Sequence, residues 1–366
     1  NAGLGKGRYD SATPSVRLGQ AVLQGTADLS SSLSAVATLS AGDRPGARID
    51  VREAWLSWDP VPDGAWKWSA KAGSFFPRSS LEVEYGGIGW TPTQTVSSSA
   101  INSWIGEELR TNGLELQLKR IGRLADSPHD IGLSAAIFRG NDPTGTLLAW
   151  RGWSISDRIS GAYAAIPLAP LPVYQADGAI PRQAHTIHPF REIDGRAGYY
   201  IGANYRYRER FELAWMDYDN RANPLAVKQG QYGWRTRFTH WSLRLRPHDN
   251  WELLVQLMHG DTLMGQNAVA LDFRAAYALI SHPLGPGRVA LRYDRFSTRE
   301  HDLLPSDPNA ERGRSVALAY SLALSDTTTL VTELLTLDST RAARALLALP
   351  TRQREHSVVT SLRWQF

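Results

Sequence analysis

Three histidines and an aspartate are the residues whose types could bind a metal ion. His185 and His188 stand in the segment HTIH, and His259 lies two residues before Asp261. Imidazole and carboxylate groups are zinc ligands, but HTIH with distant partners is not a complete ligand set, so a surface or structural role is favoured. The chain contains no G-x-S-x-G, H-E-x-x-H or P-loop motif and no cysteine. We therefore expect no metal site, no cofactor and no enzymatic activity.

Charged side chains on alternating segments are the second group whose chemistry could matter. Arg292 and Asp294 occupy even-numbered positions of their segment, whereas the odd-numbered positions hold the apolar residues Val289, Leu291 and Tyr293. Successive side chains of a β-strand point to opposite faces, so such a strand has one charged and one apolar face. Lipid cannot solvate a charge, whereas water can. The pattern therefore predicts strands that separate an aqueous side from an apolar side.

The final segment, residues 356–366, ends on the apolar parity with Leu362, Trp364 and Phe366. This ending resembles the carboxy-terminal signature of bacterial outer-membrane β-barrel proteins, in which a terminal Phe preceded by alternating hydrophobic residues is the assembly signal. The resemblance implies that these three residues form the assembly signal. It also implies that the rest of the chain supplies the other strands of a transmembrane barrel.

Further alternating segments occur along most of the chain. From residue 197 onward, short and long connections alternate strictly, as expected of tight periplasmic turns and long external loops. An even number of strands needs one more, either within Asn1–Thr13 or upstream of it, which brings the total to about 16. We expect one domain over residues 1–366, an all-β, antiparallel up-and-down transmembrane barrel. The expected strands are Val16–Leu29, Leu33–Ala41, Ile49–Trp58, Trp66–Phe75, 114–119, Ile131–Phe138, Tyr199–Tyr207, Phe211–Tyr218, Tyr232–Arg246, Trp251–Met258, Val269–Ile280, Arg288–Phe296, Arg314–Leu324, Thr328–Leu337 and the final segment.

Composition agrees with a barrel and excludes other classes. The mean hydropathy is -0.32 and no run approaches the ~20 apolar residues of a membrane helix, so a helical membrane protein is excluded. The 13 Trp and 13 Tyr crowd the ends of the expected strands, as interfacial girdles require. The net charge is +4, but the basic residues are scattered and form no cluster suited to phosphate backbones. We expect no nucleic-acid partner.

Two long segments lack the alternation: Phe76–Arg110, with a short helix expected within Ser99–Leu109, and the stretch from Arg139 to about Gly195, which we interpret as loop. Counting strands makes Phe76–Arg110 the third external loop. A barrel of this size with an acidic third loop resembles the general bacterial porins, in which that loop folds into the lumen and narrows it at mid-height. The resemblance implies four constriction-loop acids: Glu82, Glu84, Glu107 and Glu108.

A basic wall should then face the acidic loop. We assume that the face of each strand with the aromatic and aliphatic side chains points outward. The basic side chains that then point inward are those of Lys67, Lys71, Lys119, Arg206, Arg244, Arg274 and Arg292. In Val269–Ile280 this interpretation turns Phe273 and Tyr277 outward. Opposed charges across a narrow aqueous passage create a transverse field that sorts polar solutes. Each arginine either selects solutes or only braces the wall by pairing with an inward carboxylate, and both roles need the same position. Candidate carboxylates for such pairing are Glu212, Asp272 and Asp294.

The combined expectation is a weakly anion-selective porin in the bacterial outer membrane that lets small hydrophilic solutes, anions among them, diffuse passively. Its partners would be outer-membrane lipid and lipopolysaccharide, the solutes, and two further copies, since porins of this architecture are often trimers. The alternatives are a channel selective for carbohydrates, aromatic acids or phosphate, and a barrel that acts as scaffold or plugged partner of an export assembly. An outer-membrane hydrolase using His188 or His259 is a further alternative.

Overall fold

The computed structural model describes residues 16, 18–42, 49–83, 88–248 and 250–366. The strand expected within Asn1–Thr13 and the loop acid Glu84 lie outside the described residues. No helix among the described residues is long and apolar enough to cross a membrane.

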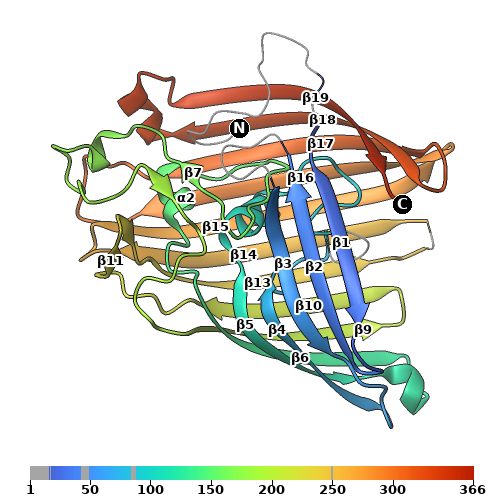
Figure 1. Cartoon of the computed structure of the whole chain (residues 1–366). Helices are drawn as coiled ribbons and strands as arrows, with labels where there is room; N and C mark the ends of the chain where they lie inside the picture. Colours follow the sequence, from blue (N-terminus) through green and yellow to red (C-terminus); the bar gives the residue numbers. More distant parts are fainter. Residues whose placement is uncertain (1–15, 17, 43–48, 84–87, 249) are drawn as a thin grey trace.

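A single antiparallel sheet of 15 strands forms most of the described structure, and its strands follow one another in chain order (Figure 1). The chain is therefore all-β, as expected. The strands are β1 (Ala21–Asp28), β2 (Leu33–Ala41), β3 (Ile49–Trp58), β4 (Trp66–Phe75), β5 (Thr111–Arg120), β6 (His129–Arg139), β9 (Gly198–Tyr207), β10 (Phe211–Asp219), β13 (Arg235–Leu245), β14 (Glu252–Met264), β15 (Val269–Leu284), β16 (Gly287–Glu300), β17 (Glu311–Ala323), β18 (Thr328–Arg341) and β19 (Arg352–Trp364).

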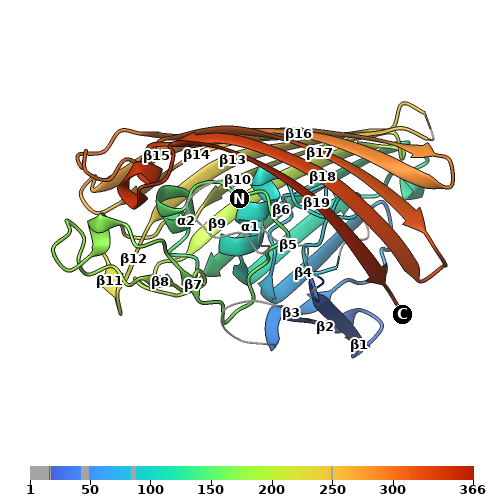
Figure 2. The ribbon, with the colours of Figure 1, turned by 90° about the horizontal axis from the view of Figure 1, so that it is seen from above.

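The sheet curves around two inserted segments. Seen from above in Figure 2, helices α1 (Ala100–Glu108) and α2 (Thr146–Trp150) lie between the walls of the curved sheet. They belong to the two long segments that lack alternation. The short pairs β7 (Ile166–Pro167) with β8 (Thr186–Ile187) and β11 (Val227–Lys228) with β12 (Gln231–Tyr232) lie outside the main sheet. We call the space on the concave side of the sheet the lumen.

Hydrophobic packing in the lumen joins the inserted segments to the inner face of the sheet. Trp104 of α1 is 1% exposed and makes edge-on ring contacts with Phe238 of β13 and Phe273 of β15. Trp153, which follows α2, makes an edge-on contact with Trp104. The third loop therefore folds into the lumen, as the resemblance implies, and the second long segment does so as well.

The strand predictions are close for most of the sheet, but one connection is wrong. Strands β2, β3 and β4 have the predicted bounds, and the helix expected within Ser99–Leu109 is α1. Strand β14 continues to Met264, six residues beyond the prediction, so its connection to β15 is only residues 265–268. The strict alternation of short and long connections fails there. The reason is a tight turn in which Gly265 and Asn267 both have positive φ, a combination that permits close reversal of the chain.

The predicted orientation of β15 is also wrong. Phe273 and Tyr277 are 0% and 2% exposed and face the lumen, whereas Arg274 and Asp272 are exposed on the opposite face. The apolar parity of this strand turns inward because α1 packs against it. Arg274 therefore lies on the outward face of the sheet, and the expectation that it lines the lumen is incorrect.

Candidate functional site

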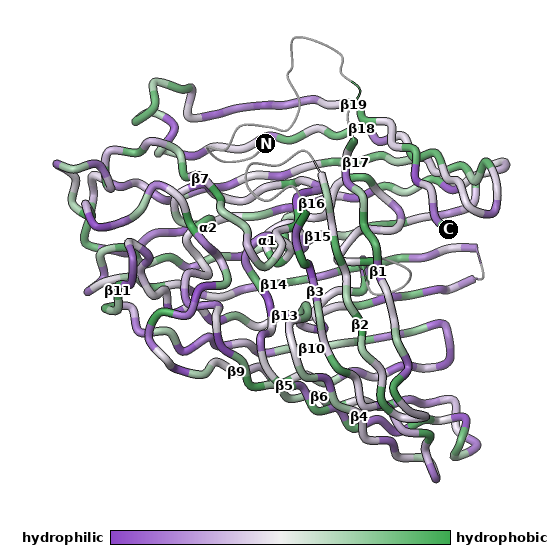
Figure 3. Tube along the Cα trace, in the orientation of Figure 1, coloured by the Kyte–Doolittle hydropathy of each residue, from purple (hydrophilic) through white to green (hydrophobic). Residues whose placement is uncertain are grey.

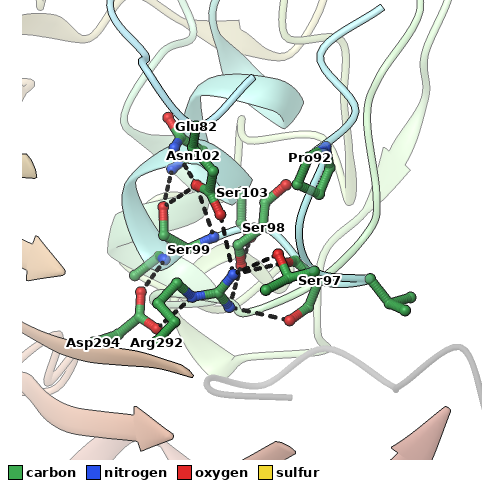
Figure 4. Close-up of polar contacts among 12 residues, drawn as sticks. Glu82, Pro92, Ser97, Ser98, Ser99, Asn102, Ser103, Arg292 and Asp294 are labelled. Atoms are coloured by element: carbon green, nitrogen blue, oxygen red, sulfur yellow. Dashed lines mark hydrogen bonds and ion pairs between the residues drawn. The ribbon is translucent and has the colours of Figure 1, made fainter. Parts of the chain in front are cut away.

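Arg292 of β16 holds the third loop against the inner wall (Figure 4). Its guanidinium is fully buried, and each nitrogen donates to a partner: Nε to Asp294 Oδ2 at 2.9 Å, and Nη1 to Glu82 Oε1 at 3.0 Å. The remaining donors meet Thr95 Oγ1, the carbonyl oxygens of Ser97 and Ser98, and Ser97 Oγ. All the donor groups of the guanidinium are used, which is the condition for a stable buried charge.

Two carboxylates complete this docking site and place the start of α1. Glu82 Oε2 accepts from Ser99 Oγ at 2.9 Å and from the side-chain amide of Asn102. Asp294 Oδ1 accepts from the backbone N–H of Ala100, the first residue of the helix, at 3.0 Å. A carboxylate at this position satisfies an otherwise unpaired N–H and favours the positive end of the helix dipole. Burial raises the pKa of Glu82, and the charge of Arg292 opposes that shift.

Other strands of the same wall bind the loop before α1. Glu333 of β18 accepts from the backbone N–H groups of Val96 and Ser97 at 2.9 and 3.1 Å. Arg363 of β19 donates to the carbonyl oxygens of Pro92 and Thr93 at 3.1 and 3.2 Å, and to that of Thr95 at 2.5 Å. The loop is therefore fixed to β16, β18 and β19 mainly through its backbone.

Glu107 and Glu108 face the second inserted segment instead of a basic wall. Glu107 pairs with Arg151 at 2.5 Å. Glu108 accepts from Trp104 Nε1 at 2.5 Å and from the backbone N–H groups of Gly145 and Leu147, at the start of α2. Burial raises the pKa of Glu108 to about 7, and these hydrogen bonds oppose the shift. These two acids therefore join the two inserted segments to each other, which the sequence did not predict.

A cluster of basic side chains remains on the other inner wall, and we call it the basic cluster: Lys67, Lys71, Arg78 and Lys119. Lys67 and Lys119 lie opposite each other in the register of β4 and β5, and Lys71 lies over the ring of Trp55 at 5.3 Å. Lys67 pairs with Asp59 at 2.9 Å, whereas Lys119 makes no ion pair with any described residue. Arg78 donates to Gln117 at 3.1 Å at the base of the third loop. Arg78 and Lys119 line a polar pocket between this loop base and the wall, together with Gln117, Ser134, Asn204, Glu212 and Ser242.

Below that pocket, charges of opposite sign alternate across four strands. In register, Asp130 of β6 lies opposite Arg206 of β9, which lies opposite Glu212 of β10, which lies opposite Arg244 of β13. Arg206 pairs with Asp130 at 2.7 Å, and Arg244 with Glu212 at 2.6 Å. Arg206, Arg244 and Arg292 therefore all contact carboxylates, the arrangement expected of residues that brace a wall. Their effect on solutes stays a prediction.

The transverse field expected between Glu82 and Arg292 does not have the expected geometry. The two groups touch at 3.0 Å, so no aqueous passage separates them. The loop acids and the basic cluster instead lie on different sides of the inserted loop, with Arg78 at its base. Glu82 contacts a wall arginine directly, and not across water as was predicted. Lys119 lines a pocket that also contains Glu212, and Lys71 lies opposite Glu115 in the register of β4 and β5.

The histidines of the metal hypothesis have separate surroundings. Asp261 pairs with Arg237 at 2.7 Å, and His185 Nε2 lies 3.2 Å from the carbonyl oxygen of Tyr174. The described carboxylates that come together are Asp142, Glu192 and Asp194, which sequence reasoning missed. Their oxygens accept backbone N–H groups of residues 140 and 193–196, so these acids organise the loop.

Several anchoring residues were missed for a common reason. Glu333, Arg363 and Arg151 stand on strands or loops with no local motif, and their role arises only from contacts with residues at least 44 positions away in the chain. The inward position of Asp294 could be predicted from the sequence, because it lies two residues from Arg292 and therefore on the same face of the strand.

The proposed assembly residues Leu362, Trp364 and Phe366 are 64%, 66% and 88% exposed, with Trp364 and Phe366 in ring contact at 5.0 Å.

Comparison with solved structures places this architecture among bacterial porins. The outer-membrane channel DcaP of Acinetobacter baumannii matches with a TM-score of 0.53 and 9% identity, over 96% of this chain and 85% of that chain. An anion-selective porin from Comamonas acidovorans matches with 0.49 and 14%, over 95% and 89%. Salmonella typhi OmpF matches with 0.49 and 9%, over 94% and 89%. No family model matches the sequence, and no curated protein sequence is significantly similar to it.

The chain thus has the porin-like fold of bacterial outer-membrane proteins. At these identities, and with two of the three TM-scores below 0.5, the likeness supports the fold alone.

Proposed function

We propose that this protein is an outer-membrane channel through which small hydrophilic anions diffuse passively. The observation that carries the proposal is the basic cluster on the inner faces of β4 and β5 and at the base of the third loop. On the opposite wall the described charges contact carboxylates or the inserted loop. Carboxylates also lie beside the basic cluster, since Asp59 pairs with Lys67 and Glu115 lies opposite Lys71 in the register. Lys119 makes no ion pair with a described residue, so the cluster keeps an excess of positive charge, and such a wall beside water concentrates anions.

The proposal includes a closed barrel of 16 strands. Strands β1 and β19 are the two edges of the described sheet. In a bilayer every backbone polar group needs a partner, so open edges are unfavourable and a strand that pairs with both would remove them. Residues 1–13, which lie outside the described residues, are long enough for one such strand. Deletion of residues 1–13 should abolish insertion into vesicles.

The proposed path for anions passes Lys119 and Lys71 between the base of the third loop and the wall formed by β4, β5, β6, β9 and β10. The pocket at this place is lined by hydroxyl and amide groups besides the charges: Gln117, Ser134, Asn204 and Ser242. Such groups can exchange hydrogen bonds with a hydrated solute without holding it tightly. The proposal therefore predicts fast, weakly selective diffusion.

The reversal potential under a salt gradient across a planar bilayer tests the selectivity. The wild type should favour chloride over potassium, and a variant with Lys67→Gln, Lys71→Gln and Lys119→Gln should lose that preference. Arg274→Gln is the matched control, because Arg274 is exposed on the outward face and should leave selectivity unchanged. A wild type that conducts without anion preference would contradict the proposed solute class.

A second candidate function is a plugged barrel that serves as partner of an export assembly. It is favoured by one observation, the buried hydrophobic layer that Trp104, Trp153 and Leu148 form with the wall across the lumen. A protein that inserts into bilayers and conducts no ions, yet retains a partner at fixed stoichiometry on purification, would support this candidate over the channel.

The remaining parts of the proposal concern activity and assembly. We propose that the protein has no enzymatic activity and that it works as a homotrimer in contact with outer-membrane lipid. Mass measurement in detergent by light scattering would test the trimer, with a monomer mass as the contradicting result.

A further inference from the structure

The outward face of β15 to β19 carries arginines in a regular arrangement that the lumen does not explain. Arg274, Arg312 and Arg352 lie in one row across the sheet, separated by Ser297 and Thr340 on the intervening strands. The next row contains Arg295, Arg314, Asp338 and Arg354 on four successive strands. We call these two rows the arginine rows. All six arginines are exposed.

The outward orientation follows from the neighbours of these residues in the chain. Arg295 stands between Asp294 and Phe296, which are 0% and 2% exposed and face the lumen. Arg274 stands likewise between Phe273 and Ala275. Strands are about 4.8 Å apart and alternate residues about 7 Å apart, so the rows cover roughly 20 Å by 7 Å of surface.

Positive charge is in large excess within the rows. Asp338 is the single carboxylate among these positions, and it pairs with Arg314, Arg352 and Arg354 at 3.7, 2.8 and 3.3 Å. Six arginines against one aspartate leave an excess of five positive charges. Arg274, Arg295 and Arg312 make no ion pair with any described residue. The adjacent outward row adds Asp272 and Arg299, which leave this excess unchanged, and a surface with such an excess attracts anionic partners.

A sharp change in polarity lies directly below the rows on the same face. The outward positions nearer the carboxyl end of β19 contain no Asp, Glu, Lys or Arg on any of the five strands. They include the exposed side chains of Ile280, Leu291, Tyr293, Val316, Leu318, Leu334, Val358 and Leu362. Figure 3 shows the corresponding change along β19, hydrophilic in its first half. This apolar band fits the hydrocarbon layer, so the arginine rows lie where lipid head groups begin.

We propose that the arginine rows bind the phosphate groups of a phosphorylated outer-leaflet lipid. The proposal rests on the outer-membrane location in the proposed function. Guanidinium groups bind phosphate through two parallel hydrogen bonds, and a grid spaced at about 5 to 10 Å offers several such contacts to one head group. A second copy of this chain fits less well, because a face with five excess positive charges needs a strongly acidic face. The outward aspartates of β10 and β14 are Asp217, Asp219 and Asp261, and Asp261 already pairs with Arg237. The outward positions of β4, β5, β6 and β9 provide no acid.

Binding of purified diphosphoryl lipid A to the full chain in detergent micelles tests the proposal. A variant with Arg274→Gln, Arg312→Gln and Arg352→Gln should bind this lipid at least tenfold more weakly than the wild type does. The wild type should also bind dephosphorylated lipid A at least tenfold more weakly than the diphosphoryl form. The matched control removes three exposed arginines elsewhere, with Arg139→Gln, Arg221→Gln and Arg237→Gln, and should bind as the wild type does.

Equal binding by the wild type and the row variant would overturn the proposal, as would equal binding of the dephosphorylated lipid. Inhibition by inorganic phosphate at micromolar concentration would show a free-phosphate site instead. A change of oligomeric state in the row variant, with unchanged lipid binding, would show an interface between copies. Conductance and reversal potential of the row variant should match the wild type, so failure here is distinct from failure of the channel proposal.

Discussion

The two inner walls of the sheet use their charges differently. On β14 to β19, Arg292 is fully buried and bonded to the third loop, and Glu333 and Arg363 bind the backbone of the same loop. On β4 and β5, the side chains of Lys71 and Lys119 are only partly buried, and Lys119 lines a polar pocket. A charge that contacts the inserted loop contributes to docking, whereas a charge that faces water can act on a solute. An inward position in a strand does not by itself show whether a charged residue docks the loop or acts on a solute.

Among the substitutions proposed here, removal of Arg292 should have the largest effect on the docking of the third loop. Arg292→Ala leaves Glu82 and Asp294 buried without their cation, which costs about 3–5 kcal/mol of unfolding free energy. The loop should also leave the wall, so single-channel conductance should rise. Urea unfolding in vesicles and bilayer recording measure the two effects. Arg274→Ala, on the exposed face, should stay within about 0.5 kcal/mol of the wild type, and equal losses in both variants would contradict the docking role.

The contact between the two inserted segments should weaken as pH rises. Burial raises the pKa of Glu108 from 4.5 to about 7, so the docked state retains a proton that the undocked state releases in this interval. Its stability is complete below pH 4.5 and falls as pH rises through 7, by about 3 kcal/mol at most. Asp142, whose pKa burial and neighbouring acids raise to about 7, contributes in the same direction.

The urea midpoint for exposure of the loop tryptophans, followed by their emission wavelength, measures this effect. The midpoint should be higher at pH 5 than at pH 8. Glu108→Gln should reduce the difference and leave the part that Asp142 contributes. A wild type with the same midpoint at both pH values would show that Glu108 is not held in its buried site.

A smaller effect is expected at the start of α1. Ser99 caps this helix, since its Oγ accepts from the backbone N–H of Asn102 at 3.3 Å, and it also donates to Glu82. Ser99→Ala should cost about 1 kcal/mol in the same urea experiment. Ser156→Ala, in the loop that contacts α1 through its backbone, serves as the control and should cost less. A loss as large as that of Arg292→Ala would mean that the cap, and not the ion pairs, fixes the loop.

Local pattern predicted the strands well, because each has a period of two that needs no knowledge of its neighbours. It placed Arg292 and Asp294 on one face correctly, since apolar residues alternate with both. It failed at β15, where the rule that apolar residues face lipid does not hold because an inserted helix covers the inner face. Glu107 and Glu108 were expected opposite a basic wall, but their partners come from a second inserted segment whose fold has no periodic signal.

We expect the aqueous path to run along the basic cluster and not along the wall that holds the third loop. The chain has no native cysteine, so single cysteines report access directly. Lys119→Cys lies at the pocket, whereas Ser315→Cys lies at an inward position of β17 that is 1% exposed, behind Asp294. Block of single-channel current by a charged methanethiosulfonate reagent is the measurement. We expect rapid block at Lys119→Cys and none at Ser315→Cys. Block at Ser315→Cys with none at Lys119→Cys would show that the path runs along the other wall.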